Sequence, residues 1–373
     1  MRVLIASDKF KGSATGAQVA AAVARGIRTV FPDAVVDAAP VADGGEGTVD
    51  AAVESGFEAI DAMVTGPTGE PVSARFAVRG AEAIIEMAAA SGLDALPGGV
   101  KAPLTATSRG TGELIAAALD HGCTSLVLGV GGSANTDGGA GMLEALGVVL
   151  RTDSGPVEPG GAALADLVSV DLSGLDHRLA AATVVLASDV DNPLLGDRGA
   201  AAVFAPQKGA SADDVAVLEA GLRRFSELLE QQPDVRAAAS DPGAGAAGGV
   251  GYAALAVLGA RREPGIDVVQ RLTGLAERID GADLVITGEG SLDDQSLGGK
   301  TPLGVAAAAR AAGVPVVAVC GRSTLSAEQA DAAGFLRVYP LSEIEPDPET
   351  SIANARVLLV EIGRRIATDL ASS

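Results

Sequence analysis

Residues 126–147 (LVLGVGGSANTDGGAGMLEALG) constrain the fold of this chain more than any other stretch. Residues 125–130 are mostly apolar and β-compatible, which predicts a short buried strand. A glycine-rich polar turn follows, and Met142, Leu143 and Leu146 then recur at helical spacing. Strand, glycine turn and helix in this order are typical of a phosphate or nucleotide loop at the carboxyl end of a parallel strand. We therefore expect the chain to build a ligand pocket around this loop.

The pattern of an apolar run followed by a polar, glycine-rich turn occurs at least five times. Each of these turns carries a carboxylate, and the five are Asp8, Asp43, Asp137, Asp189 and Glu289. One such residue alone is more often a turn or helix-capping residue. Five of them at the carboxyl ends of parallel strands indicate Mg²⁺ and phosphate binding, because glycines let backbone N–H groups approach phosphate oxygens.

The two ends of the chain share a plain alternation of strands and helices, which predicts right-handed crossovers and a mainly parallel sheet. Residues 58–78 differ, because two apolar runs separated by GPTGEP predict a hairpin. The predicted fold class is α/β with two α/β domains. One is Rossmann-like, with a mainly parallel sheet built from both chain ends (residues 1–65 plus 275–373). The other is an α/β domain inserted in the middle (residues 66–274).

Charge and composition exclude several classes of protein. The formal net charge of −21 leaves no basic surface for nucleic acid. No apolar run is long enough to cross a membrane, and the chain enters a predicted strand at once without a signal peptide. Cys123 and Cys320 lack metal-ligand spacing, as expected for a reduced, cytoplasmic protein. The oligomeric state stays open, and a homodimer is one candidate.

Lysine is scarce, with five lysines against 22 arginines. Lys11, Lys208 and Lys300 lie in turn-rich stretches, where a lysine can offer a point charge to phosphate. The alternative is that they are ordinary surface lysines. Together with the carboxylates and glycines they favour a kinase over a hydrolase, since cations neutralise the charge that develops in phosphoryl transfer.

Other catalytic motifs are weak or missing. The chain has neither a GxxxxGK[ST] loop nor a GxSxG elbow, and His121 and His177 make no metal pair. Residues 129–134 do satisfy the GxGxxG/A pattern of dinucleotide folds, with Asp153 about 20 residues further on. A dehydrogenase is nevertheless disfavoured, because residues 135–139 keep the composition of a turn where the helix should begin.

Several long motifs occur in a fixed order. They are SDKFKGS (7–13), PVADGGEGT (40–48), SRGTGELI (108–115), GVGGSANTDGGAGMLEALG (129–147), NPLLGDRGAAAVFAPQKGA (192–210), GAAGGVGYAAL (245–255) and DLVITGEGSLDDQS (283–296), with GK at 299–300. Through them the chain resembles the bacterial glycerate kinase family of the first type over essentially its full length. Two local departures are Ser291, where the motif usually has Arg after GEG, and Arg109, where Tyr is common.

The resemblance implies ATP- and Mg²⁺-dependent transfer of the γ-phosphoryl group to D-glycerate. The product is typically 2-phosphoglycerate, and the implied active site lies in a cleft between two α/β domains. Three alternatives stay open. They are phosphorylation at the 3-position, an NAD-dependent hydroxy-acid dehydrogenase, and a sensor that binds glycerate without turnover.

The candidate site residues follow from the turns and the motifs together. The predicted catalytic residues are Asp189, Glu289, Lys11 and Asp43. The predicted metal ligands are Asp189, Asp191 and Glu289, although an Asx-turn before Pro193 explains Asp191 equally well. The predicted substrate- and nucleotide-binding residues are Asp8, Ser13, Gly44, Gly45, Gly131, Gly132, Asn135, Asp137, Lys208, Asp293 and Lys300.

Overall fold

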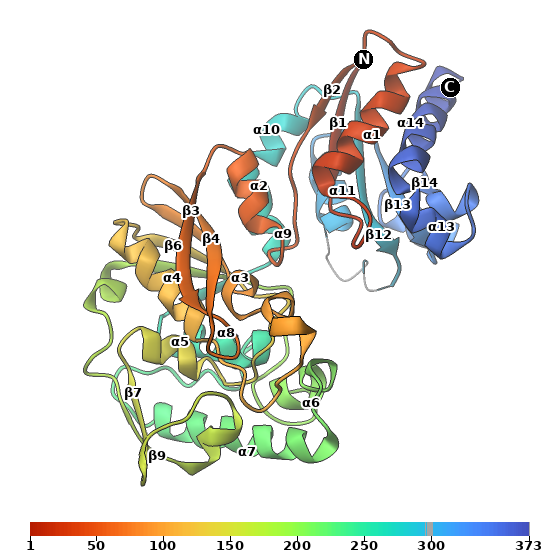
Figure 1. The fold of residues 1–373 in the computed structure, drawn as a ribbon. Coiled ribbons are helices and arrows are strands. Elements are labelled where there is room, and N and C mark those ends of the chain that lie inside the picture. The colour runs from red at the N-terminus through yellow and green to blue at the C-terminus, as the bar shows by residue number, and fades with distance from the viewer. Residues whose placement is uncertain (295, 297–300, 373) are drawn as a thin grey trace. The chain divides into compact units, whose positions relative to one another are not determined.

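The computed structural model describes residues 1–294, 296 and 301–372. The chain forms two compact units (Figure 1). Unit 1 comprises Met1–Asp43, Asp50–Ser55 and the chain from Ile266 to its C-terminal end, and unit 2 comprises Gly44–Val49 and Gly56–Gly265. Both units combine a β-sheet with helices, so the predicted α/β fold class is confirmed. In the described part of the chain no helix is both long and apolar enough to cross a membrane.

Unit 1 contains a five-stranded parallel sheet in the order β14-β13-β12-β1-β2. Its strands are β1 (Arg2–Ser7), β2 (Val35–Ala38), β12 (Leu284–Leu292), β13 (Val316–Ser323) and β14 (Val338–Pro340). The sheet is therefore built from both chain ends, as the alternating pattern predicts. The prediction of a turn at Glu289 is wrong, because β12 pairs with β13 as far as Leu292. Glu289 consequently lies within a strand and not in a turn.

Helices cover both faces of this sheet, because successive side chains of a strand point to opposite sides. Val3 and Ile5 pack with α1 (Gly16–Arg28) and α14 (Ala355–Ala371), which lie side by side (Figure 1). Leu4 and Ala6 pack with α10 (Leu275–Ile279) and α11 (Thr301–Ala311). Thr15 caps α1 through a capping box with Gln18.

The remaining helices of this part of the chain are short. They are α2 (Thr48–Glu54), α9 (Gly265–Thr273), α12 (Ala327–Ala332), α13 (Pro348–Ala353) and the 3₁₀-helix η7 (Leu341–Glu343). Asn354 separates α13 from α14 near the C-terminal end. The chain passes between the units after Asp43, within α2, after Ser55 and at the start of α9.

Unit 2 contains a six-stranded mixed sheet in the order β11-β10-β6-β5-β4-β3. Its strands are β3 (Glu58–Thr65), β4 (Pro71–Arg79), β5 (Glu82–Glu86), β6 (Ser125–Gly129), β10 (Thr183–Ala187) and β11 (Arg261–Glu263). β3 and β4 form the predicted hairpin, and β5, β6, β10 and β11 run parallel. Because β3 pairs with β4, it belongs to this sheet, whereas the predicted seam at residue 65 assigns it to the other domain.

Further elements of unit 2 surround this sheet. The helices are α3 (Ala88–Ser91), α4 (Arg109–Asp120), α5 (Ala140–Ala145), α6 (Ala200–Phe204), α7 (Ala212–Leu229) and α8 (Ala246–Ala256), with 3₁₀-helices η1 (Leu93–Ala95), η2 (Pro97–Gly99), η3 (Ala162–Asp166), η4 (His177–Ala181) and η5 (Pro206–Lys208). A small antiparallel sheet joins β8 (Gly155–Pro156), β7 (Val149–Thr152) and β9 (Leu167–Asp171). The buried rings of Phe225 and Tyr252 meet edge to face at 6.2 Å in the core of this unit.

Candidate active site

The carboxyl edge of the unit 1 sheet carries three of the predicted carboxylates. β12, β1 and β2 are neighbouring parallel strands, and Asp8 follows β1, Asp43 follows β2 and Glu289 lies near the end of β12. The Asp8 N–H donates to the Gly288 carbonyl at 2.9 Å, which fixes the first turn residue against β12. Ligands of open parallel sheets bind at this edge.

Asp8 has an unusually high proton affinity for a carboxylate. Its Oδ1 accepts from the Lys9 N–H at 2.6 Å, and its Oδ2 accepts from the Thr301 hydroxyl at 3.2 Å. Burial, followed by the negative charge of Asp43, raises the pKa of Asp8 to about 6. A carboxylate with a pKa near neutrality can take up a proton during a reaction at physiological pH.

The turn after Asp8 brings Lys11 close to β12. Gly290 packs on this turn so closely that a Cβ there would lie 3.6 Å from the backbone nitrogen of Lys11. The Ser13 hydroxyl donates to the Phe10 carbonyl at 3.0 Å and so stabilises the turn itself. Asp293 accepts from the Ser291 hydroxyl at 3.2 Å. Lys300, the other lysine predicted for unit 1, lies outside the described residues.

Asp137 in unit 2 is fully buried and organises the glycine-rich loop that follows β6. Five donors converge on its carboxylate. They are the Ser108 N–H (2.8 Å), the Ser108 hydroxyl (2.8 Å), the Asn135 side-chain amide (2.8 Å), the Gly139 N–H (3.1 Å) and the Gly141 N–H (3.3 Å). Asp137 therefore lies inside the loop as an anchor, although the sequence predicts it as a ligand-binding residue. Ser108 is a site residue that sequence reasoning missed.

Lys208 is also buried, with 1% of its surface exposed. Its ammonium donates to the Ser133 hydroxyl at 2.7 Å and to the Asn135 carbonyl. Burial lowers the pKa of Lys208 to about 7, an effect that the charge of Asp137 opposes. Lys208 thus contacts the backbone and a hydroxyl of the loop, and its contact with phosphate stays a prediction.

The segment Gly44–Val49 brings the predicted glycines together. Its N–H groups at Gly47 and Val49 donate to the Glu86 carboxylate, the former at 3.0 Å. Gly45 packs on Gly131, where an added Cβ would lie 3.1 Å from the Gly45 Cα. Gly44, Gly45 and Gly131 therefore lie at one place in unit 2. Glu86 was not among the predicted site residues. The sequence feature that could have identified it is a carboxylate within the apolar strand β5.

Asp189 and Asp191 follow β10 but have different partners. Asp189 Oδ1 accepts from the Gly265 N–H at 2.9 Å, whereas the exposed Asp191 forms an ion pair with Arg198 at 3.7 Å. Within the residues that the structure describes, no three His, Cys, Asp or Glu side chains group in a way that could hold a metal ion. The predicted metal ligands Asp189 and Glu289 belong to unit 2 and unit 1 respectively.

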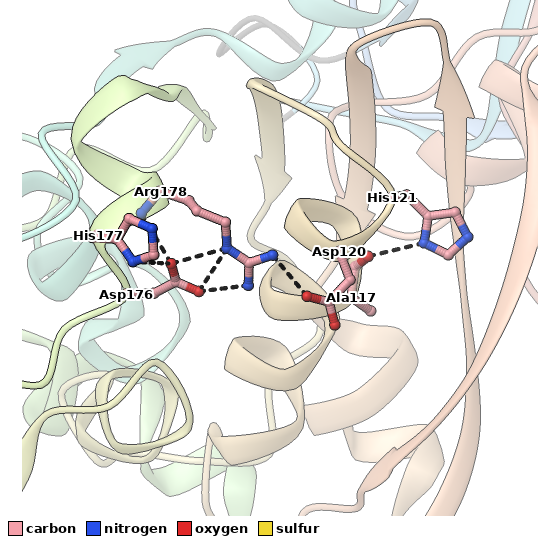
Figure 2. Close-up of polar contacts among 6 residues, drawn as sticks. All are labelled: Ala117, Asp120, His121, Asp176, His177 and Arg178. Atoms are coloured by element: carbon pink, nitrogen blue, oxygen red, sulfur yellow. Dashed lines mark hydrogen bonds and ion pairs between the residues drawn. The ribbon is translucent and has the colours of Figure 1, made fainter.

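The two histidines belong to a separate polar network in unit 2 (Figure 2). Arg178 bridges Asp176 and Asp120 at 2.7 Å each, which ties η4 to the end of α4. His177 lies beside Asp176, and His121 Nδ1 lies 3.0 Å from the Ala117 carbonyl. Figure 2 places the histidines on either side of this ion-pair network, an arrangement that supports α4 and offers no paired ligands.

Comparisons with known proteins all identify the same family. The family model described as the glycerate kinase family matches residues 3–371. A glycerate kinase of Bacillus subtilis is 49% identical over 325 residues, which cover 86% of this chain and 85% of that protein. A glycerate 2-kinase of Escherichia coli is 47% identical over 331 residues (87% and 86%). A crystal structure described as glycerate kinase 2 from Salmonella typhimurium LT2 has a TM-score of 0.85 and 41% identity, and covers 100% of this chain and 98% of that one.

Proposed function

Because the chain belongs to the glycerate kinase family, we propose that it transfers the γ-phosphoryl group of ATP to D-glycerate and releases 2-phosphoglycerate and ADP. The Escherichia coli relative is named for phosphorylation at the 2-position, which supports that product. Within the molecule, the Asp8–Asp43 pair at the carboxyl edge of the unit 1 sheet carries the proposal. It provides both a base and oxygen ligands where a parallel sheet binds its substrates.

Asp8 is the proposed general base. The oxygen of the glycerate hydroxyl attacks the γ-phosphorus, the bond from that phosphorus to the ADP oxygen breaks, and the hydroxyl proton passes to Asp8. With a pKa of about 6, Asp8 is ionised at pH 7 to 8 yet remains basic enough to take this proton. The Thr301 hydroxyl and the Lys9 N–H orient the carboxylate.

The glycine segments and Lys11 are proposed to bind anionic groups. Backbone N–H groups at Gly44, Gly45, Gly131 and Gly132 can approach phosphate or carboxylate oxygens, because no side chains shield them. In unit 2 the hydrogen bonds of Asp137 and Lys208 hold the loop in one shape, so little ordering is required on binding.

Magnesium is proposed as the cofactor, with Asp43 as its protein ligand and Asp8 left as the base. Mg²⁺ prefers hard oxygen donors and is commonly held by about one or two carboxylates together with substrate phosphates, so a cage of three carboxylates is not required. The Asp43 carboxylate, close enough to Asp8 to raise its pKa, fits that donor set. When bound, the ion would supply positive charge to the transferring phosphoryl group. Asp189, which belongs to unit 2, and Glu289, which belongs to unit 1, remain predicted metal ligands.

A coupled assay for ADP release tests the proposal. Release is expected with D-glycerate, ATP and Mg²⁺ together, and not when any one of them is left out. Phosphorus NMR of the product then distinguishes phosphorylation at the 2-position from the 3-position. Absorbance change with NAD and a hydroxy acid would favour a dehydrogenase, and glycerate binding without ADP release would favour a sensor. A cytoplasmic location and a homodimer remain predictions.

A further inference from the structure

Arg322 and Ser291 are paired neighbours at the carboxyl edge of the unit 1 sheet. The register of β12 and β13 sets Ser291 opposite Arg322, two residues beyond the pair Glu289–Cys320. This is the same edge at which Asp8 follows β1, since β1 and β12 are adjacent and parallel. Arg322 is exposed, so its head group lies at the surface of that edge.

Arg322 is held at the Nε atom of its guanidinium and not at its two terminal nitrogen atoms. Its Nε donates to the Ser291 hydroxyl at 3.1 Å, and that hydroxyl donates to Asp293 Oδ2 at 3.2 Å. In the described part of the chain, no carboxylate forms an ion pair with Arg322. Many other arginines do form such pairs, among them Arg75, Arg79, Arg109, Arg178, Arg198, Arg223, Arg236, Arg261, Arg337, Arg364 and Arg365.

The backbone around Arg322 joins it to the turn that bears Lys11. Gly321 packs on the Gly290 carbonyl, where an added Cβ would lie 2.6 Å from that oxygen. Gly290 in turn packs on the Phe10–Lys11 backbone. Two cationic residues therefore flank one glycine position at the sheet edge, in a protein whose net charge of −21 would otherwise repel anions.

We infer that Arg322 is an oxyanion-binding residue of the active site, whose guanidinium fork contacts either an ATP phosphate or the glycerate carboxylate. The inference rests on the proposed kinase function. A planar guanidinium held at Nε presents its outer N–H groups to two oxygens of one ligand, a geometry that suits phosphate and carboxylate alike. Ser291 is the residue that orients it.

Replacement of the charge tests the inference. Arg322→Gln is expected to raise KM on the order of tenfold to a hundredfold, for ATP if the partner is phosphate and for D-glycerate if it is the carboxylate. The matched control is Arg356→Gln, which removes another exposed arginine of unit 1, on α14, and should change both constants by less than about twofold. Unchanged constants for both substrates in Arg322→Gln, or an equal loss in the control, would overturn the inference.

Exchange of the paired residues provides a second test. Arg322→Ser alone should show the same rise in KM, and the double variant Ser291→Arg with Arg322→Ser should recover most of it, because the guanidinium then starts from the adjacent strand position. If the double variant melts like the wild type but keeps the raised KM, the inferred position of the guanidinium is contradicted.

Binding calorimetry separates this inference from the proposed function. If the wild type releases no ADP with D-glycerate, the proposed function fails. Affinities of ATP and of D-glycerate for the wild type and Arg322→Gln still decide the role of the arginine. If Arg322→Gln binds ATP or D-glycerate more weakly than the wild type does, the inference is supported. If the variant and the wild type bind each ligand with the same affinity, the inference is overturned.

Discussion

Asp8 in unit 1 and Asp137 in unit 2 have the same sequence signal, a carboxylate in a turn after a buried parallel strand, and very different surroundings. Asp137 accepts from five donors, two of them on Ser108 and two on the backbone N–H groups of Gly139 and Gly141 that follow it. Asp8 accepts one bond at each oxygen and faces the like charge of Asp43. The position after a strand therefore does not by itself determine the role of a carboxylate.

The difference lies in how the charge is stabilised. Around Asp137 the protein supplies the hydrogen bonds that water would otherwise supply, so the ionised group can stay buried and hold the loop. Around Asp8 the protein removes water without replacing it fully, so the proton affinity of the carboxylate rises. We infer that Asp137 contributes mainly to stability and Asp8 mainly to catalysis.

The largest expected effect is the loss of stability in Asp137→Ala. Five buried donors would lose their acceptor, which should lower the free energy of unfolding by about 3 kcal/mol or more. Thermal and urea unfolding measure this change, with Asp8→Ala as the matched control in unit 1. Equal melting of the wild type and Asp137→Ala would remove the distinction between the two carboxylates.

The next effect is on turnover in Asp8→Asn. Loss of the base should lower kcat on the order of a hundredfold or more, with the fold retained. The pKa of Asp8 is raised in the folded state, so the unfolded state loses its proton first as the pH rises, and ionised Asp8 lowers stability above about pH 6. Asp8→Asn should therefore melt at the same or a higher temperature at pH 8. A variant that melts lower and turns over normally would contradict the assignment.

Much of the fold was accessible from the sequence, because its strands are compact apolar runs. β6 (Ser125–Gly129) lies within the strand predicted at residues 125–130, and β3 and β4 form the hairpin predicted at residues 58–78. The small sheet of β7, β8 and β9 was missed, because its strands are short and their pairing links residues 149–152 with 167–171. Glycines near the end of β12 resemble a turn in sequence, yet pairing with β13 keeps them extended.

The site was accessible only in part, for the same physical reason. The turn after each strand identifies Asp8 and Asp137, but the Ser108 donors of Asp137 lie 29 positions earlier in the chain. Likewise, the sequence alone shows Ser291 only as a departure from the family motif. Its partner Arg322 becomes visible only through the strand register, which depends on long-range pairing and not on local spacing.

A smaller effect is expected on the pH profile of Asp43→Asn. The wild type should lose kcat/KM as the pH falls through about 6, where Asp8 takes up a proton. The charge of Asp43 is the second cause of that raised pKa, after burial, so its removal should shift the acid limb to lower pH. Profiles of kcat/KM from pH 5 to 8 measure the shift. An unmoved limb would mean that Asp43 does not act on the titrating group.

The smallest effect is expected for Arg178→Ala, which removes the bridge between Asp176 and Asp120 (Figure 2). Arg178 keeps the pKa of Asp176 below its ordinary value, so the pair is charged at neutral pH, but Arg178 and Asp120 are in contact with water and salt. The melting temperature should fall by less than about 3 °C, and less again in high salt, with kcat unchanged. Hydrogen bonding of Asp176 to a partly exposed arginine thus differs from that of Asp137, whose donors are buried. A fall in melting temperature as large as that of Asp137→Ala would show that the number of partners, and not their burial, sets the stabilising effect of a carboxylate in unit 2.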